Sequence, residues 1–347
     1  MADGLLPSLI MVIVQFEFAG MNIFSKLAMD TGMNPFIHVA YRQIFAFLFL
    51  APLAYFMERG KRPPMTRPVL VQIFFSSVFG LTMNQITYFV GLKNSTPTIA
   101  CALSNLLPAL TFVLAVAFKQ ESAKLKTLGG QAKLVGTLVG VAGAMVLSMY
   151  HGPVVPIGES AIHLSIANSS ANDPSQGKGN FIGPFLVIIS SLTWAIWFII
   201  QAKMGDTYPA PYSSSALMLG MATVECSIFG FIMVPHPQEW SLFPGIRALA
   251  CVYGGVACSG IGVCMMSWCI QKKGPLFVSV FSPLLLVIVA ALSWTFLHEK
   301  LYLGTVLGSV LIVMGLYSVL WGKTKEFEPL QPHKELQDTK EEDIEMN

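Results

Sequence analysis

Ten apolar stretches, each about as long as a membrane-spanning helix, occupy most of this 347-residue chain. A helix needs about 20 mainly apolar residues to cross the hydrocarbon core of a bilayer. Lipid offers no partners to backbone N–H and C=O groups, so such stretches are expected to be helical. The sequence therefore predicts an all-α membrane protein with ten transmembrane helices. The stretches are 8–29, 36–57, 69–91, 98–118, 131–150, 181–203, 211–234, 246–269, 276–297 and 302–322.

The overall composition supports the same class of protein. Only 12% of the residues are charged and 54% are hydrophobic, whereas soluble domains carry roughly 25% charged residues. The net charge of +2 gives no reason to expect a nucleic-acid partner. All six cysteines lie in apolar runs and none forms a CxxC pair, so we expect packing residues, with no metal site and no cofactor.

Lysine and arginine gather in alternate loops, and this predicts the orientation. The loops 58–68 and 119–133 are both rich in basic residues, and Lys272 and Lys273 follow the eighth span. These groups fall on one side of the membrane if both termini are cytoplasmic, which is the side that basic loops prefer. Residues 151–180 then form an extracytoplasmic loop. The charged residues 323–347 are expected to be a disordered cytoplasmic tail.

Three sets of matching residues occur in the same order in the two halves of the chain. Because each half contains five spans, the second half enters the membrane from the opposite side. We therefore expect two inverted repeats, at 8–150 and 181–322, with a central site between them near the membrane midplane. The matches join Ala19, Asp30, Thr31 and Pro35 to Ala195, Asp206, Thr207 and Pro211; Ser104 and Pro108 to Ser279 and Pro283; and Gly136 and Gly143 to Gly308 and Gly315.

Two of the matched residues are prolines in the middle of apolar spans. Proline removes a backbone hydrogen bond and clashes with the carbonyl four residues earlier, at a cost of about 3 kcal/mol or more. That carbonyl belongs to Ser104 before Pro108 and to Ser279 before Pro283. Irregular backbone is tolerated where protein or a water-filled cavity satisfies the freed groups. Two interpretations remain open: packing kinks, or breaks that expose backbone acceptors to a central cavity.

Charged side chains deep inside the spans are few and expensive, so each is a functional hypothesis. They are Glu17, Arg42 and Glu225. Arg42 could receive a substrate carboxylate on its planar guanidinium, or it could pair with a helix end or a carboxylate to hold the fold. Glu225 could relay protons, or it could be a neutral, hydrogen-bonded acid.

Uncharged polar and aromatic residues complete a candidate substrate site. A small zwitterion or weak acid needs a few donors and acceptors beside an aromatic wall. Hydrogen bonds between helices are the alternative role for each polar residue taken singly. The candidate substrate-binding residues are Gln15, Arg42, Asn84, Gln85, Tyr88, Ser104, Asn105, Pro108, Trp194, Gln201, Glu225, Trp268, Ser279 and Pro283.

The sequence also resembles a known family. The segments "SNLLPALTFVLAVAFKQE" and "FSPLLLVIVAALSWTFLHEKLYLGTVLGSVLIVMGLYSVLWGK" resemble the EamA repeat of the drug/metabolite transporter superfamily. The segments "AGMNIFSKLA", "YRQIFAFLFLAPLAYFMERGKRP", "NQITYFVGLKNSTPT" and "QAKLVGTLVGVAGAMVLSMYHGP" are similar to its plant nodulin-type branch, which includes the Walls-Are-Thin-related and UMAMIT transporters. Glu17 departs from that pattern, which has a small residue between "VQF" and "FAG".

The resemblance implies a transporter that moves amino acids or auxin across the plasma or vacuolar membrane, often in both directions. We therefore expect a facilitator of amino acids that works by alternating access, in the plasma membrane or alternatively the vacuolar membrane. Transport of auxin or related indoles and a non-transporting receptor or scaffold remain alternatives. The sequence has no GxSxG or HExxH motif and no phosphate-binding glycine loop, so no enzyme activity is expected.

Overall fold

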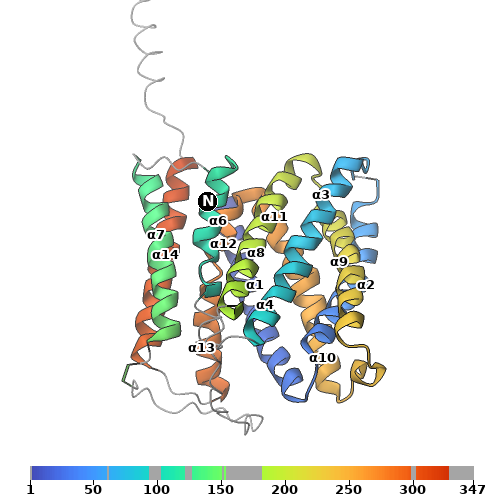
Figure 1. Cartoon of the computed structure of the whole chain (residues 1–347). Coiled ribbons are helices and arrows are strands. Elements are labelled where there is room, and N and C mark those ends of the chain that lie inside the picture. The colour runs from blue at the N-terminus through green and yellow to red at the C-terminus, as the bar shows by residue number, and fades with distance from the viewer. Residues whose placement is uncertain are drawn as a thin grey trace, which may run out of the picture.

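The computed structural model describes residues 2–60, 62–93, 103–121, 127–150, 152–153, 182–297 and 302–327. These residues fold into helices joined by short turns (Figure 1). The first half contains α1 (Ala2–Asp30), α2 (Pro35–Glu58), α3 (Arg67–Ser77), η1 (Val78–Met83), α4 (Asn84–Lys93), α6 (Leu107–Ala117) and α7 (Leu128–Met149). The second half contains α8 (Ile182–Thr207), α9 (Pro211–Met233), η2 (Pro237–Trp240), α10 (Gly245–Tyr253), η3 (Gly254–Gly262), α11 (Val263–Lys273), α12 (Pro275–Ser279), α13 (Leu284–Leu297) and α14 (Leu303–Phe327).

The predicted all-α membrane fold is confirmed. Within the described ranges, nine helical segments are long and apolar enough to cross a membrane. The remaining predicted span, 98–118, is represented by the shorter apolar helix α6, because residues 98–102 lie outside the described ranges. Most of the predicted loop 151–180 also lies outside them. The start of α1 and the end of α14 lie at the same end of the bundle, as an even number of spans requires (Figure 1).

Helix starts are capped by side chains, in one case by a local residue and in another by a residue from the other half of the chain. Asn34 precedes α2, and its side-chain oxygen accepts the N–H of Phe36 at 3.1 Å, while Pro35 supplies a helical φ at the first position. At the start of α9 the cap comes from the other half of the chain. The Glu58 carboxylate, at the end of α2, accepts the N–H groups of Tyr212 (3.1 Å) and Ser213 (2.7 Å). The two halves are therefore joined at this end of the bundle.

Spans three and eight both contain a π-helix. η1 begins at Val78 and η3 at Gly254, which stand at the same spacing as the repeat pair Asp30 and Asp206. The irregular turns thus fall at equivalent positions in the two halves. π-Helical turns inside α-helices are rare and are frequent at functional sites.

Spans four and nine are broken at the two matched prolines. α6 begins one residue before Pro108, and α12 ends at Ser279 before α13 begins after Pro283. Across the second break the N–H of Ser282 donates to the Ser279 carbonyl at 3.0 Å, and Leu285 bonds to Ser282 in the same way at 3.1 Å. The expectation that Pro283 leaves the Ser279 carbonyl unpaired is therefore wrong. The chain tightens into turns with hydrogen bonds between residues three apart, which satisfy that carbonyl.

Spans five and ten form a close helix pair at one edge of the bundle (Figure 1). A Cβ added to Gly136 would lie 2.8 Å from the carbonyl oxygen of Gly315, and one added to Gly143 would lie 2.9 Å from that of Gly308. The four glycines that marked the repeat therefore face each other. As residue numbers rise along α7 they fall along α14, so these equivalent spans run antiparallel, as inverted repeats require.

A buried ion cluster ties the end of α14 to the first half. Glu121 pairs with Lys323 and lies 3.5 Å from the ammonium of Lys133, and Lys323 also donates to the Lys273 carbonyl at 2.6 Å. The side chain of Lys133 is fully buried and that of Lys323 is 7% exposed. α14 extends past the predicted start of the tail at residue 323 and ends at Phe327. The rest of the tail lies outside the described residues.

Candidate functional site

Arg42 is a buried cation held where the two halves meet. It lies on α2, is 8% exposed, and donates from Nε to the hydroxyl of Ser259 on η3 at 2.7 Å. Nη1 lies 3.1 Å from the sulfur of Met21. Gly254 makes room for this side chain, since a Cβ there would lie 3.2 Å from the Arg42 Cδ. Among the residues that the structure describes, Arg42 has no carboxylate within ion-pair distance. Its hydrogen-bond partners are thus a hydroxyl and a thioether, and no carboxylate of the described residues compensates its charge.

Glu225, on the equivalent span of the second half, contacts the other π-helix region. It lies on α9 of the second half, and its two carboxyl oxygens accept the hydroxyls of Ser77 (2.7 Å) and Thr82 (2.5 Å), which flank and form η1. Each π-helix region thus receives an ionisable side chain from the opposite half: Arg42 at η3 and Glu225 at η1. Because both oxygens of Glu225 are engaged, its observed role is to join α9 to the third span.

Glu17 lies on α1 beside η3 and was not among the predicted site residues. Its backbone carbonyl accepts from the Cys258 thiol (3.2 Å) and the Tyr253 hydroxyl (3.3 Å). Its carboxyl oxygen Oε2 is buried and has no hydrogen-bond partner among the described residues. A Cβ added to Gly262 would lie 3.0 Å from that oxygen. Two signals in the sequence could have placed Glu17 here: its depth in the first span and the glycine-rich run "GGVACSGIG" in the eighth.

Several of the predicted polar residues make contacts between helices. The Asn84 side-chain amide donates to the carbonyl (2.9 Å) and hydroxyl (3.0 Å) of Ser190 on α8. Gln201 donates to the Ser76 hydroxyl at 3.0 Å. These two residues behave as links between helices. The Oε1 atoms of Gln201 and of Gln85 are nevertheless buried without a hydrogen-bond partner in the described part of the chain, so each retains an unused acceptor.

The predicted aromatic walls are packed within the bundle. Trp194 stacks on Trp197 with ring centroids 4.6 Å apart, and Trp268 packs against the main core. Tyr88 lies edge-on to Phe89 at 5.5 Å. Gln15, on α1, is 4% exposed. The role of these residues as substrate ligands stays a prediction.

The two prolines border the same small cavity. It has a volume of about 10 Å³, room for roughly one water, and α7 and α14 close it with Gly136, Gly140 and Gly315 among others. Ser104 is helical, Asn105 begins the turn just before α6, and Asn105 is 6% exposed. The Ser279 hydroxyl donates to the Leu276 carbonyl at 3.0 Å. The predicted set is thus not gathered in one place: the proline group lies here, Arg42 and Glu225 lie at η3 and η1, and the other residues pack between helices.

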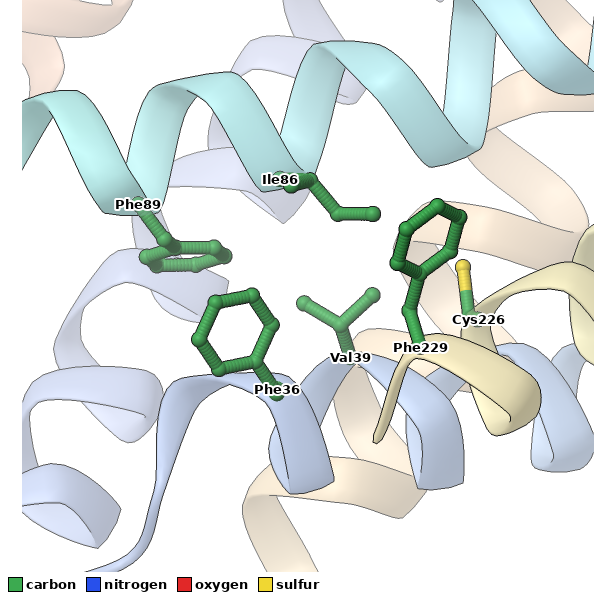
Figure 2. A pocket seen from close by; sticks show the side chains of 6 residues that line it. All are labelled: Phe36, Val39, Ile86, Phe89, Cys226 and Phe229. Carbon is green, nitrogen blue, oxygen red and sulfur yellow. The ribbon is translucent and has the colours of Figure 1, made fainter. Parts of the chain in front are cut away.

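A second small cavity is lined by aromatic side chains that the sequence did not single out. Figure 2 shows rings from α2, α4 and α9 turned toward one another around it. It also has a volume of about 10 Å³. Cys226, one of its walls, follows Glu225 in the sequence and has its sulfur 3.6 Å from the Thr82 hydroxyl. The lining residues are Phe36, Val39, Ile86, Phe89, Cys226 and Phe229.

Comparisons with known proteins agree with this architecture. A family model described as "EamA-like transporter family" matches residues 5–149 and 181–321. A WAT1-related protein of Arabidopsis thaliana is 40% identical over 326 residues, which cover 92% of this chain and 81% of the relative. A second is 37% identical over 331 residues, covering 95% of each. A solved structure titled "Crystal structure of protein" has a TM-score of 0.67 at 17% identity, covering 93% of this chain and 99% of its own, and supports the fold alone.

Proposed function

Because this chain belongs to the EamA-like transporter family, we propose that it facilitates the movement of amino acids by alternating access between its two halves. The family membership itself makes it a multi-pass membrane transporter and not an enzyme. The choice of amino acids as cargo, the plasma membrane as location and the absence of tight ion coupling are the proposed parts.

The observation that carries the proposal is the uncompensated charge of Arg42. Burying a charged group without a partner is costly, and an ionisable side chain inside a membrane is a functional group by default. Arg42 uses Nε on Ser259, and no carboxylate of the described chain is paired with it. A substrate carboxylate would accept two parallel hydrogen bonds from the guanidinium and would compensate its charge.

Contacts between the halves at both ends of the bundle fit alternating access. At one end the Glu58 carboxylate caps α9. At the other, Arg247 on α10 donates from Nε to the Thr31 hydroxyl at 2.9 Å and also contacts the Thr31 carbonyl. Both contacts are made at once in this structure. Opening either end while the other stays closed would expose a site between the inverted halves to one side only.

The aromatic cavity of Figure 2 favours a second candidate cargo, auxin or a related indole. Its rings from Phe36, Phe89 and Phe229 would suit an aromatic group if the three helices moved apart. In that case Arg42, three residues along α2 from the cavity wall Val39, would still receive the carboxylate.

Purified protein in liposomes is expected to exchange labelled amino acids in both directions without concentrating them. A pH gradient should change the rate little, because Glu225 is held by Ser77 and Thr82 and so is poorly placed to relay protons. Uptake of L-amino acids and of indole acetate should be measured with and without an imposed gradient. Accumulation well above equilibrium that Glu225→Gln abolishes would show tight proton coupling instead. Uptake of indole acetate alone would favour the second candidate.

The proposed orientation places both termini in the cytoplasm and residues 151–180 outside. Single cysteines introduced as Arg62→Cys or Ser170→Cys into a chain without its native cysteines are expected to differ in labelling. A membrane-impermeant maleimide applied to intact cells should label position 170 and spare position 62 until the cells are permeabilised. The reverse pattern would invert the topology.

A further inference from the structure

We propose that Glu17 binds the ammonium group of the cargo, so that Glu17 and Arg42 together recognise a zwitterion beside η3. The inference rests on the proposed function, because it concerns the same cargo and the same junction of the two halves. It assigns a ligand-binding role to a residue that the sequence alone left outside the candidate site.

The two ionisable groups approach one π-helix from neighbouring spans. Both α1 and α2 pack against η3, with Glu17 at the Gly262 end and Arg42 hydrogen-bonded to Ser259. Between those contacts, the Cys258 thiol of the same π-helix donates to the Glu17 backbone carbonyl at 3.2 Å. Even so, Glu17 and Arg42 do not form an ion pair, whose N–O distance would be 4.0 Å or less. In the proposed complex the cargo would offer its positive end to Glu17 and its negative end to Arg42.

The carboxyl group of Glu17 has an open acceptor at this place. Its Oε2 is buried and unpartnered within the described ranges, and buried polar atoms in native structures are seldom left so without a reason. Gly262 keeps the space beside it clear, since a Cβ would lie only 3.0 Å away. An ammonium group offers three donors and a compensating charge, which are the features that a buried carboxylate lacks here.

Two-point recognition would separate amino acids from weak organic acids. A monocarboxylate could bind Arg42 but would leave the Glu17 carboxyl without its partner. Sites built to bond a polar group of the substrate discriminate strongly against analogues that lack it, because their own buried groups are then unpaired. The same geometry therefore favours amino acids over indole acetate.

A matched set of three ligands tests the two ends separately. L-Phenylalanine carries both charges, phenylpropionate lacks the ammonium group and phenethylamine lacks the carboxylate; the leucine set with isocaproate and isoamylamine serves if leucine is the better cargo. In the wild-type protein both single-charge analogues should compete at least about tenfold more weakly than the amino acid. Glu17→Gln should weaken amino-acid binding about tenfold, the loss of roughly one charge-assisted hydrogen bond, and change phenylpropionate less than about twofold. Glu239→Gln, the same substitution at an exposed position, is the matched control and should change neither.

The outcomes separate this inference from the proposed function. If the wild type moves amino acids but phenylpropionate competes equally well, or if Glu17→Gln weakens both ligands alike, Glu17 is not the ammonium site while amino-acid transport stands. If the wild type moves no amino acid, the proposed function fails first. If Glu17→Gln does not reach the membrane, the competition series on the wild type still decides, and Glu17→Asp, which keeps the carboxylate, should retain the preference for the amino acid.

Discussion

Replacing Arg42 with glutamine is expected to lower the transport efficiency for amino acids by roughly 30- to 1,000-fold. Truncating one partner of a buried charge pair costs about 2–4 kcal/mol, and each 1.4 kcal/mol corresponds to about tenfold. Glutamine can still hydrogen-bond to Ser259 but has no charge for a carboxylate. Arg42→Lys keeps the charge but loses the planar guanidinium, so its transport efficiency should lie between those of the wild type and Arg42→Gln. Initial rates in liposomes over a range of substrate concentrations measure the change.

The matched control is Arg59→Gln, which removes an exposed arginine that lies over the Tyr55 ring at 5.2 Å. It should leave transport within about twofold of the wild type, since exposed charges contribute little. Thermal stability of each variant should be measured in parallel. If Arg42→Gln transports normally and loses only stability, then Arg42 serves the fold through Ser259, and the proposed carboxylate site is wrong.

Replacing Gly143 with alanine is expected to destabilise the protein by about 3 kcal/mol or more, at the upper end of overpacking substitutions. The new Cβ would lie 2.6 Å from the Leu311 Cβ, 2.8 Å from the Ile312 nitrogen and 2.9 Å from the Gly308 carbonyl oxygen. Two of these atoms are backbone, so the clash cannot be relieved by a change of rotamer, and α7 and α14 must separate. The yield of monodisperse protein and its melting temperature in detergent should both fall.

Gly140, one turn away on the same helix, is the control. A Cβ there has no neighbour within 4 Å, and alanine in a helix is favoured over glycine by roughly 0.5–1 kcal/mol. Gly140→Ala should therefore be neutral or slightly stabilising. Equal losses at both positions would mean that any side chain on α7 is harmful, and the close pairing would not be the cause.

The spans and the repeat could be predicted because lipid leaves the backbone few choices. A long apolar run has to be helical, and glycines such as Gly136 and Gly315 recur because two helices must approach closely. The π-helices could not be predicted in the same way. The extra residue in the turns that begin at Val78 and Gly254 changes no hydropathy pattern, and only the packed structure shows it.

The candidate site was predictable in part. Arg42 was found because a buried cation is conspicuous in an apolar run, but its partner Ser259 lies 217 residues away in sequence and nothing local connects them. Glu17 was noticed as a deep carboxylate. Its proposed role as a ligand, however, depends on the space that Gly262 leaves beside its carboxyl group, and the sequence does not show that the two residues are neighbours. The Ser279 carbonyl was misjudged because a proline predicts which bond is lost, and not the bond to Ser282 that replaces it.

Because α7 pairs with α14, one face of α7 stays uncovered during most of the synthesis of the second half. α7 ends at Met149 and α14 begins at Leu303, so its partner emerges only after roughly 150 further residues, about 10–30 s at 5–20 residues per second. During that time Gly136 and Gly143 have no helix to cover them. Until α14 is inserted, this face of the nascent first half is covered by lipid or by insertion factors. A chain that stops before its last helix would leave that face of α7 uncovered, and cellular quality control could recognise the exposed face as a sign of an incomplete protein.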